Sequence, residues 1–428
     1  MTVNTNASAE SDQHPNCSFP QYARGPTCSG MALTSGDVDL DAFRELLTPR
    51  GQRALAEAGE LVGADPVVAA TKLRKTYDAV LTSAALTQAG LRERARAKFG
   101  EDAARMYFTP HGLEQSTRAE VAEHRARRLT GSWPGTPSVV DACCGIGGDF
   151  LALARAGCTV TAVDTDPLTA AVAGANAEAL GLGDRVTVSV ADAAEIRPEE
   201  YDVLFADPAR RTSRGRTFDP MAYSPPWPVV LDLVSRASRA CVKVAPGIPY
   251  EFIPDGADAE WVSYKGEVKE AALWTGLQEA TRRATLLPGG HTLTATGVEA
   301  HVGPVGRYVY EPDGAAIRAH LVGEVAEIVG GRLLDPLIAY ITGDEPIDTP
   351  WAARYEISDV IPFSLKRLRA LLRERQIGNV TIKKRGSAVD IERLRSDLRL
   401  NGEKSAVIIL TRIIDKPSVI ICDATPPA

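Results

Sequence analysis

Apolar residues recur at helical spacing through the first third of the chain. The first such stripe consists of Leu40, Phe43, Leu46 and Leu47, and its period of about 3.6 residues predicts a helix. A second helix is predicted to begin at Asp65-Pro66, because an N-cap aspartate followed by proline is typical of a helix start. Helical patterning continues to about Arg128 and ends in the glycine- and proline-rich segment 131–137, which predicts a domain boundary.

The pattern changes after residue 137. Short apolar segments alternate with helical segments of about 10–15 residues, which is typical of βαβ units and a mostly parallel sheet. The five predicted strands are Ser138–Asp141, Cys158–Val163, Val186–Val190, Asp202–Ala206 and Ala240–Ala245. Ligands bind at the carboxyl edge of such sheets, so the residues that follow each strand are the first candidates for a site.

The patterns divide the chain into five parts. These are a disordered tail (1–36), a helical N-terminal domain (37–130), an α/β domain (131–300), an unassigned connecting region (301–354) and a small α+β domain (355–428). The last part is predicted from a helix that Ser364 caps, followed by a strand, a second helix and two further strands. We therefore expect an α/β protein with smaller domains on either side of its core.

The composition excludes several classes of protein. With 44% hydrophobic and 24% charged residues, the chain is neither disordered throughout nor collagen-like, and it lacks the run of about 18 apolar residues that a membrane-spanning helix needs. The seven cysteines have no Cys-x-x-Cys spacing and the histidines no metal-ligand spacing. We expect reduced thiols, no metal and a cytoplasmic location, because the first 36 residues also lack the features of a secretory signal.

A glycine-rich turn follows the first predicted strand and reads Asp141-Ala-Cys-Cys-Gly145-Ile-Gly147-Gly148-Asp149. A dinucleotide fingerprint needs a third glycine where this chain has Phe150, so an NAD-linked oxidoreductase is disfavoured. Asp164 ends the second strand, nineteen residues after Gly145, where a carboxylate can accept hydrogen bonds from two ribose hydroxyls. Asp192 follows the third strand and can receive an adenine amino group. These features predict an adenosine-containing ligand; alternatively, the two aspartates only cap helices.

The segment Val139–Ala191 resembles the class I S-adenosylmethionine-dependent methyltransferases. It is most similar to the RNA cap guanine-N2 (trimethylguanosine synthase-like) enzymes, which share the form Asp-Ala-x-Cys-Gly-x-Gly-Gly. The resemblance implies a Rossmann-like sheet of seven strands with one antiparallel edge strand, and S-adenosylmethionine as cofactor. It also implies roles for individual residues: Asp141, Gly145 and Gly147 on the methionine side, Asp164 at the ribose and Asp192 at the adenine.

The fourth predicted strand ends in Asp207-Pro208-Ala209-Arg210. Amino-methyltransferases usually have Asp, Asn or Ser at this position, followed by Pro-Pro and an aromatic residue. The side-chain oxygen of the first residue and the carbonyl oxygens beside the prolines orient an amine toward the methyl group. We expect Asp207 and Pro208 to be catalytic, although Ala209 and Arg210 depart from the pattern. Arg210 and Arg211 belong to an arginine-rich loop expected to bind substrate, by stacking on a base or contacting phosphate; alternatively, it is an ordinary solvated loop.

A second segment, Ser224-Pro225-Pro226-Trp227, fits that tetrapeptide letter for letter. No apolar strand precedes it, however, and a helix follows directly. Prolines are common at a helix start. We therefore expect Asp207 to be the better candidate and Trp227 to serve in packing.

The charge is unevenly distributed. The chain carries −7 overall, whereas residues 361–400 hold eleven Lys or Arg against four Asp or Glu, a local +7. The α+β domain that contains these residues (355–428) resembles the THUMP-like domains that follow such methyltransferases, which implies RNA as a partner. The sequence thus predicts a methyltransferase that acts on RNA, on an rRNA or tRNA base. Two alternatives remain: a methyltransferase acting on a small molecule or protein, and a non-catalytic RNA-binding protein that has kept the fold.

Overall fold

The computed structural model describes residues 40–131, 133–209, 219–277 and 280–423, together with the backbone of 211–212 and 215–216. The described chain begins with helices α1 (Leu40–Leu46), α2 (Pro49–Gly59), α3 (Pro66–Leu73), α4 (Ala79–Phe99), α5 (Pro110–Gln115) and α6 (Ala119–Gly131). The predicted start at Asp65-Pro66 is correct, because the Asp65 side chain accepts hydrogen bonds from the amides of Val67 and Val68.

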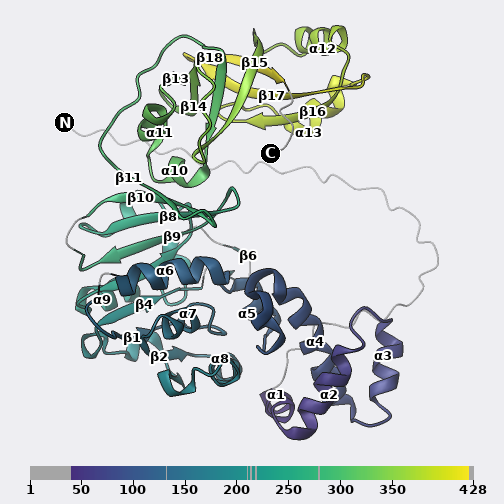
Figure 1. The fold of residues 1–428 in the computed structure, drawn as a ribbon, viewed down its shortest axis with the longest axis vertical. Helices are drawn as coiled ribbons and strands as arrows, with labels where there is room; N and C mark the ends of the chain where they lie inside the picture. Colours follow the sequence, from purple (N-terminus) through teal and green to yellow (C-terminus); the bar gives the residue numbers. More distant parts are fainter. Residues whose placement is uncertain are drawn as a thin grey trace, which may run out of the picture. The chain divides into compact units, whose positions relative to one another are not determined.

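Nine strands form one sheet within the described residues, in the order β11-β10-β8-β9-β7-β4-β1-β2-β3. Figure 1 shows β10, β8 and β9 side by side in this sheet. They are β1 (Ser138–Asp141), β2 (Thr159–Asp164), β3 (Val186–Val190), β4 (Val203–Ala206), β7 (Ala240–Val244), β8 (Asp258–Tyr264), β9 (Glu267–Thr275), β10 (Arg282–Leu287) and β11 (His291–Thr294). The seven expected strands are present, and β10 and β11 extend them. Two strands run antiparallel to their neighbours: β11 at the edge of the sheet, where an antiparallel strand was expected, and β9, which lies between β7 and β8.

Helices connect the parallel strands of this sheet. They are α7 (Phe150–Arg155), α8 (Pro167–Ala179) and α9 (Trp227–Arg236), and a two-stranded ribbon of β5 (Arg211–Thr212) and β6 (Gly215–Arg216) lies between β4 and α9. Strands β1 to β4 and β7 all run parallel to their neighbours on this side. Their carboxyl ends therefore meet at one edge, where a ligand can reach the turns that follow each strand.

The described part of the second sheet has seven strands, ordered β13-β14-β12-β15-β18-β17-β16. Its elements are β12 (Tyr308–Pro312), α10 (Gly314–Arg318), α11 (Val322–Ile328), β13 (Arg332–Asp335), β14 (Ile338–Gly343), β15 (Ala352–Pro362), α12 (Leu365–Glu374), β16 (Ile377–Lys384), α13 (Ile391–Leu398), β17 (Lys404–Ile413) and β18 (Lys416–Asp423). The region 301–354, which the sequence left unassigned, thus supplies β12, β13 and β14. Strand β15 pairs with β12 through its first half and with β18 through its second.

Buried acidic residues distinguish strands β8 and β9. Asp258, Glu260 and Glu270 are each at most 2% exposed, and they pair with arginines of helix α6. Burial raises the pKa of Glu260, but His124 and Arg128 more than offset it and lower the pKa to about 2. Charged residues at core positions break the apolar alternation that marks a strand, which is why sequence patterning did not find β8 and β9.

Candidate active site

A cavity of about 460 Å³ opens at the carboxyl edge of the nine-stranded sheet. Among the residues that line it are five of the predicted site residues, Gly145, Asp164, Asp192, Asp207 and Pro208. Asp141, the last residue of β1, and Gly147, within the glycine turn, do not line the cavity. Arg210 falls outside the described residues, and of Arg211 only the backbone, in β5, is described. Three of the five predicted cofactor residues therefore share one cavity with the predicted catalytic pair.

The two key glycines of the turn have different reasons for being glycine. Gly145 lines the cavity with φ +53°, and a Cβ added there would meet no atom within 4 Å. Gly147 has φ +100°, and a Cβ there would lie 2.7 Å from the Phe150 ring. A side chain at Gly145 would therefore enter the ligand space, whereas one at Gly147 would collide with the start of α7.

The same substitution is expected to affect mainly stability at Gly147 and mainly cofactor binding at Gly145. Gly147→Ala is expected to lower the unfolding free energy by roughly 1–3 kcal/mol, because the added methyl overpacks a filled site. Gly145→Ala is expected to destabilise the fold less and to weaken cofactor binding more. Urea unfolding and titration calorimetry with S-adenosylmethionine separate the two effects, and equal losses of stability in both variants would contradict this interpretation.

Asp164 and Asp192 differ in how their carboxylates are used. Asp164 accepts hydrogen bonds from the amides of Gly145 and Asp166, each at 3.0 Å. It does not cap α8, because the N-cap of that helix is Asp166. Burial raises the pKa of Asp164, and those two amides oppose the shift. Asp192 caps a short 3₁₀ turn by accepting a hydrogen bond from the amide of Ala194 at 2.9 Å. The same residue also lines the cavity.

Asp141 is a fully buried carboxylate beneath the glycine turn. Its Oδ1 accepts a hydrogen bond from the amide of Cys143 at 3.2 Å, whereas Oδ2 has no partner. Burial, followed by the charge of Asp149, raises the pKa of Asp141 well above its ordinary value. A buried carboxylate oxygen without a partner is unfavourable unless a ligand satisfies it. A positively charged ligand above the turn would do so, and the open space at Gly145 leaves room for one.

The segment Asp207-Pro208-Ala209 follows β4 and forms another part of the cavity wall. Ala209 and Ser224 exchange two backbone hydrogen bonds, of 2.7 and 3.0 Å, which bring Ser224-Pro225-Pro226 onto the wall beside Asp207. Trp227 is 3% exposed and packs edge-on against Tyr223. The prediction of a packing role for Trp227 agrees with this environment. The sequence did not predict that Ser224-Pro225-Pro226 would line the cavity.

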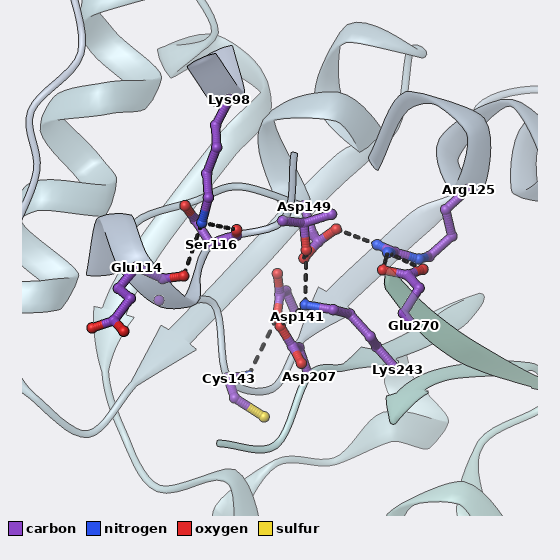
Figure 2. A network of polar contacts seen from close by, with 12 residues as sticks. Lys98, Glu114, Ser116, Arg125, Asp141, Cys143, Asp149, Asp207, Lys243 and Glu270 are labelled. Carbon is purple, nitrogen blue, oxygen red and sulfur yellow. Dashed lines mark hydrogen bonds and ion pairs between the residues drawn. The ribbon is translucent and has the colours of Figure 1, made fainter. Parts of the chain in front are cut away.

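Behind this wall runs a network of buried charges, shown in Figure 2. Lys243 on β7 contacts Asp207 and donates a hydrogen bond to Thr117 Oγ1 at 2.8 Å, and the Thr117 hydroxyl donates to Asp149 at 2.8 Å. Arg125 of α6 pairs with Asp149 and forms two bonds with Glu270, of 2.6 and 2.7 Å. Burial raises the pKa of Asp149, but Arg125 and Lys243 hold it below its ordinary value.

The N-terminal helices supply one wall of the cavity. Gly112 and residues 114–117 line it, and Lys98 of α4 holds this loop by donating to the carbonyls of Leu113, Glu114 and Ser116 at 2.7–2.8 Å (Figure 2). Burial, together with the charge of Lys243, lowers the pKa of Lys98 to about 8. Sequence reasoning missed this wall and Lys243; a lysine inside the apolar strand 240–245 was the available signal.

Comparisons with known proteins identify this arrangement. An uncharacterized S-adenosylmethionine-dependent methyltransferase of Mycobacterium tuberculosis is 36% identical over 337 residues, which cover 76% of this chain and 90% of the relative. The chain belongs to the S-adenosylmethionine-dependent methyltransferases. The predicted cofactor, S-adenosylmethionine, is thereby confirmed, and the orphaned oxygen of Asp141 and the open space at Gly145 suit its positive charge and its need for close approach.

Further comparisons cover other parts of the methyltransferase. Residues 136–230 match the model of the RNA cap guanine-N2 methyltransferases, residues 352–424 the THUMP domain-like family, and residues 39–95 a domain of unknown function. The uracil-C5 23S rRNA methyltransferase RlmD of Acidithiobacillus ferrooxidans is 33% identical over 114 residues, 25% of this chain and 26% of that protein. A crystal structure described as a methyltransferase from Porphyromonas gingivalis W83 has a TM-score of 0.70 at 22% identity, covering 88% of this chain and 99% of that one.

No described helix is both long and apolar enough to cross a lipid bilayer. In the same part of the chain, no three histidine, cysteine, aspartate or glutamate side chains gather as ligands for a metal ion.

Proposed function

We propose that this methyltransferase acts on RNA in the cytoplasm and methylates an rRNA or tRNA base over Asp207-Pro208. The observation that carries the proposal is the shared cavity: Gly145, Asp164 and Asp192 line one part of it, and Asp207, Pro208 and Ser224-Pro225-Pro226 line another. When bound, S-adenosylmethionine supplies an electrophilic methyl group. A ligand held at the first set of residues would lie within reach of an acceptor held at the second.

The residues of the cavity have distinct proposed tasks. Asp164 holds the ribose hydroxyls, Asp192 meets the adenine amino group, and Asp141 faces the positive charge of the methionine part, with Gly145 and Gly147 shaping the turn. Asp207 accepts a hydrogen bond from the substrate group to be methylated and thereby orients the lone pair of that group. Pro208 and the neighbouring prolines exclude water. Positioning and desolvation supply most of the rate in such a transfer.

Cys143 also lines the cavity, and its thiol bears on which kind of atom could accept the methyl group. Burial, then the charges of Asp141 and Asp207, raise the pKa of the Cys143 thiol well above its ordinary value. A thiol that stays protonated is a poor nucleophile, so this site does not suit carbon methylation that begins with attack by a cysteine. An amine nitrogen, which can donate a hydrogen bond to Asp207, fits the cavity better.

Two features support RNA as the substrate. The core matches the model of the RNA cap guanine-N2 methyltransferases, and the C-terminal domain matches the THUMP domain-like family. In that domain, exposed cations gather on two helices that contact each other, α12 and α13; they are Lys366, Arg367, Arg373, Arg393 and Arg395. An array of exposed cations binds phosphates by releasing counterions.

Asp164→Ala is expected to weaken S-adenosylmethionine binding by roughly 1.5–3 kcal/mol, the worth of a hydrogen bond to a charged group. The substitution removes the proposed ribose acceptor and also the partner of the Gly145 amide. Titration calorimetry measures the loss, with Asp166→Ala as the control because Asp166 caps the adjacent helix without lining the cavity. An unchanged dissociation constant for Asp164→Ala would remove the ribose assignment.

The substrate is tested with extract from cells that lack this protein. Purified protein and methyl-labelled S-adenosylmethionine are added, and label is counted in large RNA, small RNA, protein and metabolites. Label in RNA that Asp207→Asn abolishes, together with RNA binding that weakens steeply with salt, is the expected result. Label confined to protein or metabolites would overturn the RNA proposal and leave the methyltransferase assignment intact.

A further inference from the structure

Lys243 is a charged residue in a strand that is buried at every position. Strand β7 consists of Ala240–Val244, and the Lys243 side chain is 5% exposed. A buried ammonium is strongly unfavourable unless its partners are well placed. Every other residue of the strand is apolar or a cysteine, so the lysine is not needed to form the sheet. The groups that Lys243 contacts therefore indicate its function.

Both contacts of Lys243 lead to the cavity. Its ammonium pairs with Asp207 Oδ2 and donates to Thr117 Oγ1 at 2.8 Å, and Figure 2 shows the Lys243 side chain beside Asp207. Asp207 and Thr117 line the cavity, whereas Lys243 does not. The lysine therefore touches the wall from behind, and any effect on a bound substrate must pass through the residues it holds.

We propose that Lys243 is a positioning residue that fixes the Asp207 carboxylate for the methyl acceptor. With Oδ2 held by the ammonium, the carboxylate cannot rotate freely, and Oδ1 is left to accept a hydrogen bond from the acceptor. A carboxylate accepts hydrogen bonds and donates none, so the methyl acceptor must offer Asp207 an N–H or O–H group. The inference rests on the proposed function, because Asp207 has its role there.

The lysine is itself held in place. Thr117 accepts from Lys243 and donates to Asp149, and Asp149 pairs with Arg125, which is anchored to Glu270. This chain of contacts joins the wall formed by loop 112–117 to the sheet. A competing explanation is that Lys243 only balances the buried carboxylates and stabilises the fold, and the experiment must distinguish that role from positioning.

The test is a double-mutant cycle with Lys243→Met, Asp207→Asn and the double variant. Initial rates are measured with methyl-labelled S-adenosylmethionine at saturation and total RNA from cells lacking the protein, or whichever fraction takes label. Cofactor affinity and urea unfolding are measured on the same samples. Lys269→Met is the matched control, because Lys269 lies on the neighbouring strand β9 and pairs with Glu267 away from the cavity.

We expect Lys243→Met to slow turnover by about 10- to 100-fold while the cofactor dissociation constant stays within about twofold. The double variant should be no slower than Asp207→Asn alone, since a residue that acts through Asp207 has nothing to position once it is changed. Lys269→Met should turn over normally. If Lys243→Met is too unstable to assay, the double variant, which lacks both charges, still gives the comparison with Asp207→Asn.

Two outcomes would overturn the inference: wild-type turnover in Lys243→Met, or a double variant slowed by the product of the two single effects. A loss of stability with unchanged turnover would support the purely structural explanation instead. Normal turnover in Asp207→Asn would be a different failure, because it would remove Asp207 from the proposed function. The two failures are therefore distinguishable in one set of measurements.

Discussion

Replacing Asp207 with asparagine is expected to reduce turnover by about 10²- to 10⁴-fold, the usual loss when a group acting on the reacting centre is removed. Asp207 follows β4 and lies on the cavity wall beside Ser224-Pro225-Pro226. An amide has the shape of the carboxylate but lacks its charge, so it orients the acceptor less firmly. The affinity for S-adenosylmethionine should stay within about twofold, because Asp207 follows β4, which β1 separates from β2 and β3, the strands that carry or precede Asp164 and Asp192.

Asp207→Asn also leaves the ammonium of Lys243 without its anionic partner, which lowers stability. Asp207→Glu is therefore measured in parallel, since it keeps the charge and displaces it by one methylene. Both variants should bind cofactor and turn over slowly. If the glutamate variant were fully active, the position of the carboxylate would not matter, and the acceptor site would have to lie elsewhere on the wall.

The largest effect on stability is expected from Arg125→Met, which should lower the unfolding free energy by about 3–5 kcal/mol. The Arg125 side chain is 4% exposed and lies between Asp149 and Glu270, over the Phe205 ring. Methionine fills similar space but removes the cation that the buried carboxylates of Asp149 and Glu270 share. Because Arg125 is on α6 and Glu270 on β9, their pairing joins the N-terminal helices to the sheet.

A neighbouring arginine provides the control. Arg127 is on the same helix, 66% exposed, and its distance to Glu123 is 3.8 Å. Arg127→Met should change stability by less than about 0.5 kcal/mol, because exposed ion pairs contribute little. Urea unfolding followed by tryptophan fluorescence measures both. Equal stability of the two variants would mean that the buried network contributes no more than a surface pair.

Local patterns were enough to predict the strands and turns that bring Gly145, Asp164 and Asp192 to the cavity. The turn from Asp141 to Asp149 and the aspartates after β2 and β3 lie within about fifty residues, so their spacing reflects one supersecondary arrangement. The network behind Asp207 could not be predicted in this way. Arg125 and Glu270 are 145 residues apart and Thr117 and Lys243 are 126 apart, and nothing local indicates which buried charges will meet.

The same reasoning explains why the C-terminal part was only partly predicted. The helices after Ser364 and Asp390 have capping side chains that a sequence shows directly. Strands β12, β13 and β14 have no such local signal, because they are formed by pairing with other strands of the sheet. An expected start at residue 355 falls inside β15, and the sheet continues on both sides of that strand.

Strand β15 therefore has a consequence for how this protein can be divided. Its first residues bond to β12 and its last to β18, so a cut at residue 352, where the THUMP-like match begins, separates a strand from its neighbour. The released fragment would carry an open backbone edge along half of β15, and open edges invite self-association. A fragment for RNA-binding measurements should begin before β12, and an insertion or recombination event that respects folding would place its junction there as well.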